Sequence, residues 1–196
     1  MDELTRSIRE EEYDILFGVI NRFIGYFTRQ TVPRSSNDIS HEYSFVAMDT
    51  RQAYEQIRLA RDFLVNRGQV IAELSFIDIG CGIGNILLLA EMMDFQVTGI
   101  EKDTATLPIA RQLLGKERIF AHDIWAFDDV ATFDVIYYFR PFSSREPQVR
   151  FERLVEDQLK VGGILIANMK MDDGIDNDPR FLRLSSKMPV WCKRVA

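Results

Sequence analysis

Three glycines at alternate positions, Gly80, Gly82 and Gly84, are the residues whose type and spacing most clearly suggest binding chemistry. They follow an apolar run at residues 76–79, typical of a buried strand, and precede an apolar segment at residues 85–93, typical of a helix. Glycine has no Cβ, so the backbone can turn sharply and a ligand can approach it closely. The unpaired N–H groups at a helix start can meet a polar ligand. The pattern therefore predicts a nucleotide or nucleoside site at the carboxyl end of a parallel strand.

An acidic residue follows the next predicted strand. Glu101 comes directly after residues 96–100, about 20 residues beyond Gly80. A carboxylate at this distance can accept hydrogen bonds from both vicinal hydroxyls of a ribose. A dinucleotide fingerprint also needs glycine or alanine where Asn85 stands, so the G-x-G-x-x-G/A pattern is not met. A nicotinamide-dependent oxidoreductase is therefore the least favoured alternative.

The stretch DIGCGIG at residues 78–84 resembles motif I of the class I, or seven-strand, S-adenosylmethionine-dependent methyltransferases. Glu101 matches the acidic residue of motif II in that family. Asp123 matches the residue that accepts a hydrogen bond from the adenine amino group, and Ile124 and Trp125 match the apolar neighbours of the ring. The resemblance implies S-adenosylmethionine as the cofactor, with contacts from Asp78, Gly80, Cys81, Gly82, Gly84, Glu101, Lys102, Asp123, Ile124 and Tyr138.

The elements that must position these residues alternate along the chain. Strands are predicted at residues 76–79, 96–100, 117–121, 133–139 and 164–168, and a terminal hairpin at residues 181–185 and 190–195. Helices are predicted between them, and the acidic loop at residues 171–179 is too short for the usual helix before the sixth strand. The resemblance implies an α/β fold, a Rossmann-like three-layer sandwich whose seven-stranded sheet is mostly parallel with an antiparallel C-terminal hairpin strand.

The N-terminal part precedes this pattern. Residues 4–27 predict an amphipathic helix, and the charged run at residues 10–12 allows a break in it. The helix covers the core in the simplest interpretation, and a homo-oligomer interface or a substrate lid are alternatives. A loop at residues 41–48 is expected over the cofactor, where Tyr43 and Phe45 either shape the site or simply pack. We expect one methyltransferase domain over residues 1–196, with a helical or lid segment at 1–48 and a cofactor-binding core at 49–196.

The methyl acceptor is not fixed by any motif. Methylases of base amines often carry Asn/Asp-Pro-Pro-Tyr after the fourth strand, whereas this chain has YFRPF at residues 138–142. This departure argues against base N-methylation, and Tyr138 or Arg140 could contact substrate or cofactor. No catalytic base is recognisable. A protein side chain or a small molecule is favoured over RNA, and a catalytically silent cofactor-binding or scaffold subunit is the alternative from another class.

Composition restricts the remaining possibilities. The net charge of −6 argues against a general nucleic-acid binder. No apolar run reaches the roughly 20 residues of a membrane helix. Two cysteines, Cys81 and Cys192, form no disulfide framework, and with His41 and His122 they are too few for a soft metal site. We therefore expect a cytoplasmic protein with no metal and no membrane partner.

Overall fold

The computed structural model describes residues 3–195, with side chains described from residue 11 onward. The N-terminal helix prediction at residues 4–10 therefore has no side-chain description, and positions 1, 2 and 196 of the predicted domain lie outside the described residues. The helices are α1 (Glu3–Thr31), α2 (Thr50–Asn66), α3 (Asn85–Glu91), α4 (Leu107–Leu114) and α5 (Arg145–Gln158). The strands are β1 (Ser75–Ile79), β2 (Gln96–Ile100), β3 (Ile119–Phe120), β4 (Val135–Phe139), β5 (Ile164–Asn168), β6 (Phe181–Arg183) and β7 (Val190–Lys193).

The strands form one sheet with the order β3-β2-β1-β4-β5-β7-β6. Strands β1 to β5 run parallel to one another, and β7 runs antiparallel to both β5 and β6. The register places Asp78 of β1 beside Gly99 of β2 on one side and Tyr137 of β4 on the other. The predicted fold class, including the antiparallel C-terminal hairpin, is confirmed.

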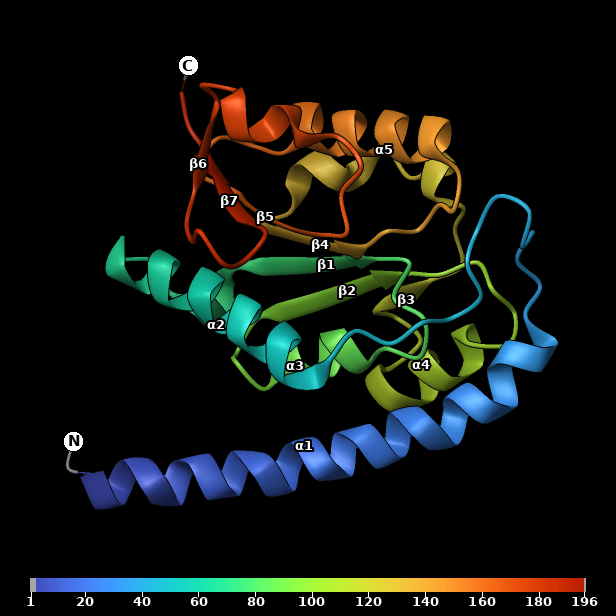
Figure 1. The fold of residues 1–196 in the computed structure, drawn as a ribbon, viewed down its shortest axis with the longest axis horizontal. Coiled ribbons are helices and arrows are strands. Elements are labelled where there is room, and N and C mark those ends of the chain that lie inside the picture. The colour runs from blue at the N-terminus through green and yellow to red at the C-terminus, as the bar shows by residue number, and fades with distance from the viewer. Residues whose placement is uncertain (1–2, 196) are drawn as a thin grey trace.

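Helices cover both faces of this sheet (Figure 1). Helix α5 buries Phe151 and Val155 against one face, and Leu159, directly after the helix, packs in the same cluster. Helices α2, α3 and α4 pack against the other face. Helix α1 lies outside α2, α3 and α4 in the view of Figure 1. It adds Phe17 and Ile20 to the core on that side. Loops follow the carboxyl ends of the parallel strands. These loops form the candidate site described below.

Local signals set the limits of the helices. Asp49 caps α2 because its carboxylate accepts a hydrogen bond from the Gln52 N–H at 2.8 Å. Gly115 ends α4 with a φ of 98°, a conformation that glycine adopts without a Cβ penalty. Helix α1 runs unbroken through residues 10–12, so the allowed break is absent. Glu11 and Glu12 are exposed there, and their charges stay in water without interrupting the backbone hydrogen bonds.

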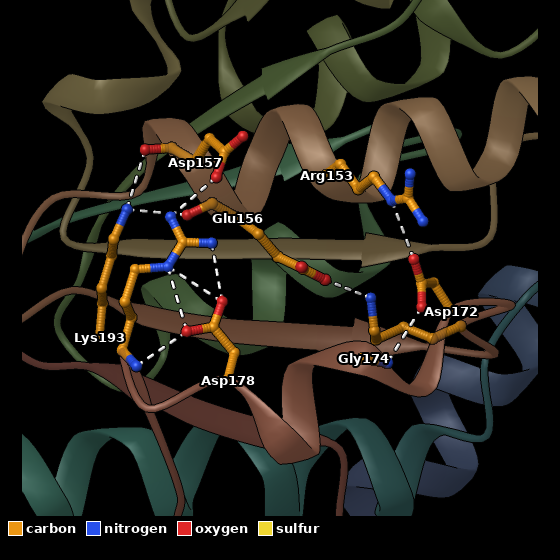
Figure 2. A network of polar contacts seen from close by, with 9 residues as sticks. Arg153, Glu156, Asp157, Asp172, Gly174, Asp178 and Lys193 are labelled. Carbon is orange, nitrogen blue, oxygen red and sulfur yellow. Dashed lines mark hydrogen bonds and ion pairs between the residues drawn. The ribbon is translucent and has the colours of Figure 1, made fainter. Parts of the chain in front are cut away.

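The connection between β5 and β6 holds only a short 3-10 turn, Asp173–Asn177, as predicted from its length. Figure 2 shows how this part of the chain is tied to α5 through Asp172, which accepts a hydrogen bond from Arg153 Nε at 3.0 Å. Arg180, at the end of the same connection, donates to the Asp157 carboxylate of α5 at 2.8 Å. Polar contacts therefore hold in place a loop that has no packed helix of its own. Among residues 3–195, no helix is both long and apolar enough to cross a membrane.

Candidate functional site

A cavity lies at the carboxyl ends of β1, β2 and β4. Its volume is about 220 Å³, far above the roughly 10–15 Å³ that one water molecule needs. The lid segment, which we define as residues 35–48, supplies one wall, and the glycine loop after β1 supplies the opposite wall. Clefts at this edge of an open parallel sheet are where ligands of α/β proteins bind.

Glu101 lies directly against the glycine loop. Its Oε2 accepts a hydrogen bond from the Gly82 N–H at 2.7 Å, and its Oε1 accepts one from the Asp103 N–H at 2.8 Å. Burial raises the pKa of this carboxyl group, and the backbone hydrogen bonds from Asp103 and Gly82 oppose that effect. The carboxylate is thus held in a fixed orientation in the cavity wall, with lone pairs left on both oxygens for a ligand.

Asp78 and Tyr137 form a second polar pair in the cavity wall. They sit side by side on β1 and β4, and each is almost fully buried. Burial, with a smaller contribution from the charge of Glu101, raises the pKa of Asp78 well above its usual value. The Tyr137 hydroxyl has no hydrogen-bond partner among the described residues.

Unpaired polar atoms are concentrated around this cavity. Among the described residues, six buried side-chain polar atoms lack a partner, and four of them belong to cavity-lining residues: Asn37, Glu42, Tyr137 and Arg140. Each such atom costs free energy unless something binds it, so the set indicates a polar ligand. The residues of the cavity therefore fit a ligand with several hydrogen-bonding groups. A nucleoside that carries an amino-acid tail is a ligand of this kind.

The lid segment is fixed at its start and at Glu42. At its start, Ser35 Oγ donates to Asp103 at 2.7 Å and the Ser36 N–H donates to the same carboxylate at 3.0 Å. Further along, Glu42 pairs with Phe142 through a backbone bridge and forms an ion pair with Lys102. These contacts tie the lid segment to the loops that follow β2 and β4.

The part of the lid segment that follows Glu42 reaches the glycine loop. The Phe45 ring lies against Gly82, so close that a Cβ on that glycine would overlap it. Gly82 also has a φ of 54°, which side-chain-bearing residues rarely adopt. Glycine is therefore required at this position both by the backbone and by the ring above it.

The adenine-side residues also lie at the cavity. Asp123 accepts a hydrogen bond from the Trp125 N–H at 2.9 Å and forms an ion pair with Lys102 at 3.1 Å. Burial raises the pKa of Asp123, but the Trp125 hydrogen bond and Lys102 outweigh this effect and hold the pKa below its ordinary value. Lys102 thus joins Glu42 of the lid segment to Asp123.

Two residues at the other side of the cavity have strained backbones. Arg140, directly after β4, has a φ of 30°, and Met169, directly after β5, has a φ of 57°. Both line the cavity. A non-glycine residue held in this region costs about 1–3 kcal/mol, and such residues cluster at functional sites.

Most of the predicted site residues meet at this cavity. Its lining includes Asp78, Gly80, Cys81, Gly82, Glu101, Lys102, Asp123 and Ile124. The predicted loop residues Tyr43 and Phe45 also line it.

Two predicted contacts need correction. Gly84 does not line the cavity, because its φ of 85° starts α3 and it packs against Ala110 and Leu114 of α4. Tyr138 faces the opposite layer, where its ring packs against Phe151 of α5 with centroids 5.0 Å apart. Successive side chains of a strand point to opposite faces, so Tyr137 takes the cavity position.

Sequence reasoning missed Tyr137, Asn37 and Glu42. Tyr137 could have been found from the strand alternation, had the pairing of Asp78 with β4 been known. Asn37 and Glu42 sit in a loop whose path depends on distant anchors, so no local signal identifies them.

Comparisons with known proteins agree with this geometry. The family described as "Methyltransferase domain" matches residues 77–167. No curated protein matches the chain. Among solved structures, the plantazolicin methyltransferase BpumL in complex with SAH is 17% identical with a TM-score of 0.51, over 80% of this chain and 55% of that chain.

Two further solved structures are similar in part. BpumL with a monoazolic desmethylPZN analog and SAH is 17% identical with a TM-score of 0.50, over 75% of this chain and 51% of that chain. The sugar N-methyltransferase KedS8 from Streptoalloteichus sp ATCC 53650 is 21% identical with a TM-score of 0.48, over 67% of this chain and 52% of that chain.

The chain spans about half the length of the solved structures it matches. Identities at this level show a shared fold and nothing finer. Residues 77–167 match the methyltransferase-domain family, and the seven-stranded sheet with its antiparallel C-terminal hairpin is the fold that the sequence resemblance implied.

Proposed function

We propose that the protein transfers a methyl group from S-adenosylmethionine to a small molecule or to a protein side chain. The observation that carries this proposal is the position of Glu101, whose carboxylate is bound to the Gly82 N–H in the cavity wall. The methyltransferase-domain family match over residues 77–167 supports it independently.

The residues around the cavity match the parts of this cofactor. Glu101 would hold the ribose hydroxyls, because it presents two fixed acceptor oxygens. Asp123 would accept from the adenine amino group, beside the apolar side chain of Ile124. Asp78 and Tyr137 lie side by side on β1 and β4 and line the cavity, where they would contact the amino-acid tail of the cofactor.

The bound cofactor supplies a sulfonium whose methyl group is transferred by in-line displacement. The chain then has to hold the acceptor close and in line with that methyl group, which can supply most of the rate. Tyr43, Phe45 and Phe142 line the cavity, so their aromatic rings would reduce the contact of a bound cofactor with water. A general base is needed only for an acceptor that cannot lose its proton to water.

The shape of the site favours a compact acceptor. The lid segment forms one wall of the cavity and is anchored to the loops after β2 and β4, so an acceptor must fit beside it or present a thin side chain. Lys102, a cation of the lining, is already paired with Glu42 and Asp123. An RNA backbone would need a run of free cations along its path, which supports a small molecule or a protein side chain instead.

Titration calorimetry with S-adenosylhomocysteine tests cofactor binding directly. We expect saturable binding of one equivalent by the wild-type protein and no comparable binding of NAD. A folded wild-type sample that does not bind S-adenosylhomocysteine would rule out the proposal.

A second experiment tests the assigned orientation of the nucleoside. Asp123→Asn replaces an acceptor-only carboxylate by an amide that can also donate. We expect it to shift the preference from S-adenosylhomocysteine toward S-inosylhomocysteine, whose purine carries a carbonyl in place of the amino group. Glu91→Gln, at an exposed ion pair with Arg118, is the control and should leave the preference unchanged.

Methyl transfer itself is tested with labelled cofactor in a lysate resolved into protein, RNA and small-molecule fractions. We expect label in the protein or small-molecule fraction. Label confined to RNA would contradict the proposed acceptor class while leaving the reaction type intact.

A further inference from the structure

Arg140 differs from the other cation of the cavity wall. Lys102 is paired with Glu42 and Asp123, whereas Arg140 has no carboxylate partner among the described residues. Its Nε is buried without a hydrogen-bond partner, and its one side-chain hydrogen bond to the described residues is a long one of 3.3 Å from Nη2 to the Ser143 carbonyl. A guanidinium carries five N–H donors and no acceptor, so most of its donor capacity in the cavity is left for a ligand.

The Arg140 side chain is held in place. Its backbone follows β4 in a positive-φ conformation, and Pro141 comes next. Its guanidinium stacks over the Tyr43 ring of the lid segment, 5.5 Å from the centroid. A planar guanidinium fixed in this way is preorganised to bind a planar carboxylate through two parallel hydrogen bonds.

The surroundings of Arg140 are apolar. Phe139 and Phe142 flank it along the chain, and Met169 comes from the end of the neighbouring strand β5; all three line the cavity. At the cavity mouth, Val46 and Met169 are exposed by 55% and 60%. An apolar wall and rim with one free guanidinium suits a molecule that is apolar or aromatic and carries one negative charge.

We propose that Arg140 is the carboxylate receptor of the acceptor pocket and that the methyl acceptor is a small apolar or aromatic carboxylic acid. This inference rests on the proposed methyltransferase function and names its substrate class. The same guanidinium chemistry would also suit the carboxylate of the cofactor's amino-acid tail, so the experiment separates these two sources.

The test measures binding to protein saturated with S-adenosylhomocysteine, using two matched pairs of probes: cinnamate with cinnamamide, and hexanoate with hexanamide. We expect the wild-type protein to bind the acid of at least one pair about 10-fold to 100-fold more tightly than its amide, the range for hydrogen bonds to charged groups. Arg140→Gln should abolish that preference. Arg145→Gln, an exposed arginine outside the cavity, should retain it.

A parallel titration identifies the source of the carboxylate. S-adenosylhomocysteine carries the amino-acid tail, and 5′-methylthioadenosine lacks it. We expect Arg140→Gln to leave the affinity for both unchanged, which also shows that the variant is folded. Selective loss of S-adenosylhomocysteine affinity would assign Arg140 to the cofactor and overturn the inference.

Equal affinity of the wild-type protein for acid and amide in both pairs would likewise overturn it. This failure is distinguishable from failure of the proposed function, because the latter appears as an absence of S-adenosylhomocysteine binding before any probe is added.

Discussion

The loops after β2 and β3 carry carboxylates held by backbone N–H groups, whereas the ends of β4 and β5 carry a free cation and strained backbones. Glu101 accepts from the Gly82 N–H at 2.7 Å, and Asp123 accepts from the Trp125 N–H at 2.9 Å. Arg140 and Met169 instead adopt positive φ values of 30° and 57°. We refer to these two sides as the cofactor half and the acceptor half of the cavity.

The two halves also differ in how their loops are supported. In the cofactor half, the Glu101 and Asp123 carboxylates accept hydrogen bonds directly from backbone N–H groups. The acceptor half depends on a buried relay in α5: Gln148 Oε1 accepts from the Phe142 N–H at 3.1 Å, and Gln148 Nε2 donates to Glu152 at 2.8 Å. Glu152 then accepts from the Met171 N–H at 2.8 Å. One helix therefore holds the loops after β4 and β5 together.

Glu152→Ala should cause the largest loss of stability among these variants, and the loss should arise in the acceptor half. Glu152 is fully buried and pairs with Lys170, which also pairs with Glu156. Removing one partner of a buried ion pair lowers the free energy of unfolding by about 3–5 kcal/mol. Urea denaturation measures this loss.

Asp157→Ala is the matched control for Glu152→Ala, because Asp157 sits on the same helix and pairs with Arg180 while 65% exposed (Figure 2). An exposed pair of this kind contributes about 0–1 kcal/mol. Equal losses in the two variants would show that the relay does not support the acceptor half.

Gly82→Ala should have the next largest effect and acts on the cofactor half. The new Cβ would overlap the Phe45 ring, an overpacking cost of about 1–3 kcal/mol. The positive φ adds roughly 1–2 kcal/mol. We expect lower thermal stability and weaker S-adenosylhomocysteine binding.

The double variant Gly82→Ala with Phe45→Ala separates these two costs. Removing the ring should recover the stability that Gly82→Ala loses through the overlap. The loss caused by the positive φ should remain. If the double variant loses as much stability as the two single variants summed, the ring does not limit the glycine.

Glu101→Gln should weaken S-adenosylhomocysteine binding by about 10-fold to 100-fold, the range for hydrogen bonds to a charged group. Both carboxylate oxygens accept backbone N–H groups, so an amide must direct its NH₂ toward one of those donors. Calorimetry gives the affinity. Arg140→Gln is the comparison from the acceptor half, and an equal loss of S-adenosylhomocysteine affinity in both variants would erase the distinction between the halves.

Asp103→Asn should have the smallest effect and tests the anchor of the lid segment. Burial raises the pKa of Asp103, but hydrogen bonds from Ser36, Ala105 and Ser35 outweigh it and hold the pKa below the ordinary value of 3.8. A carboxyl group with a lowered pKa in the folded state stabilises that state above its unfolded pKa. The contribution is lost as the pH falls through the folded pKa.

The difference in unfolding free energy between the wild type and Asp103→Asn should therefore stay constant from pH 7 to about pH 4 and shrink on further acidification. Asp62→Asn, an exposed position on α2, is the control and should show no such change. A difference that grows on acidification would contradict the sign of this linkage.

Much of the fold and of the cofactor half could be predicted from local patterns. The limits of β2 and β5 agree with the predicted residues 96–100 and 164–168, because short apolar runs between turn residues define buried strands. The positions of Gly82, Glu101 and Asp123 at one cavity follow from βα spacing, since parallel strands bring their carboxyl ends to the same sheet edge.

The acceptor half could not be predicted in the same way. Tyr138 rather than Tyr137 was assigned to the site, because the alternation of a strand does not say which face meets the cavity. The register of β4 against β1 decides this, and it is a property of the assembled sheet.

The amino-acid sequence by itself determined the order of strands and helices, the glycine turn and the acidic residue that faces it, because these depend on neighbours within about one βα unit. Only the tertiary structure decided where the lid segment lies and that Arg140 has a buried Nε without a partner. Those features depend on contacts between residues far apart along the chain, such as Ser36 with Asp103, and only the folded sheet brings these residues together.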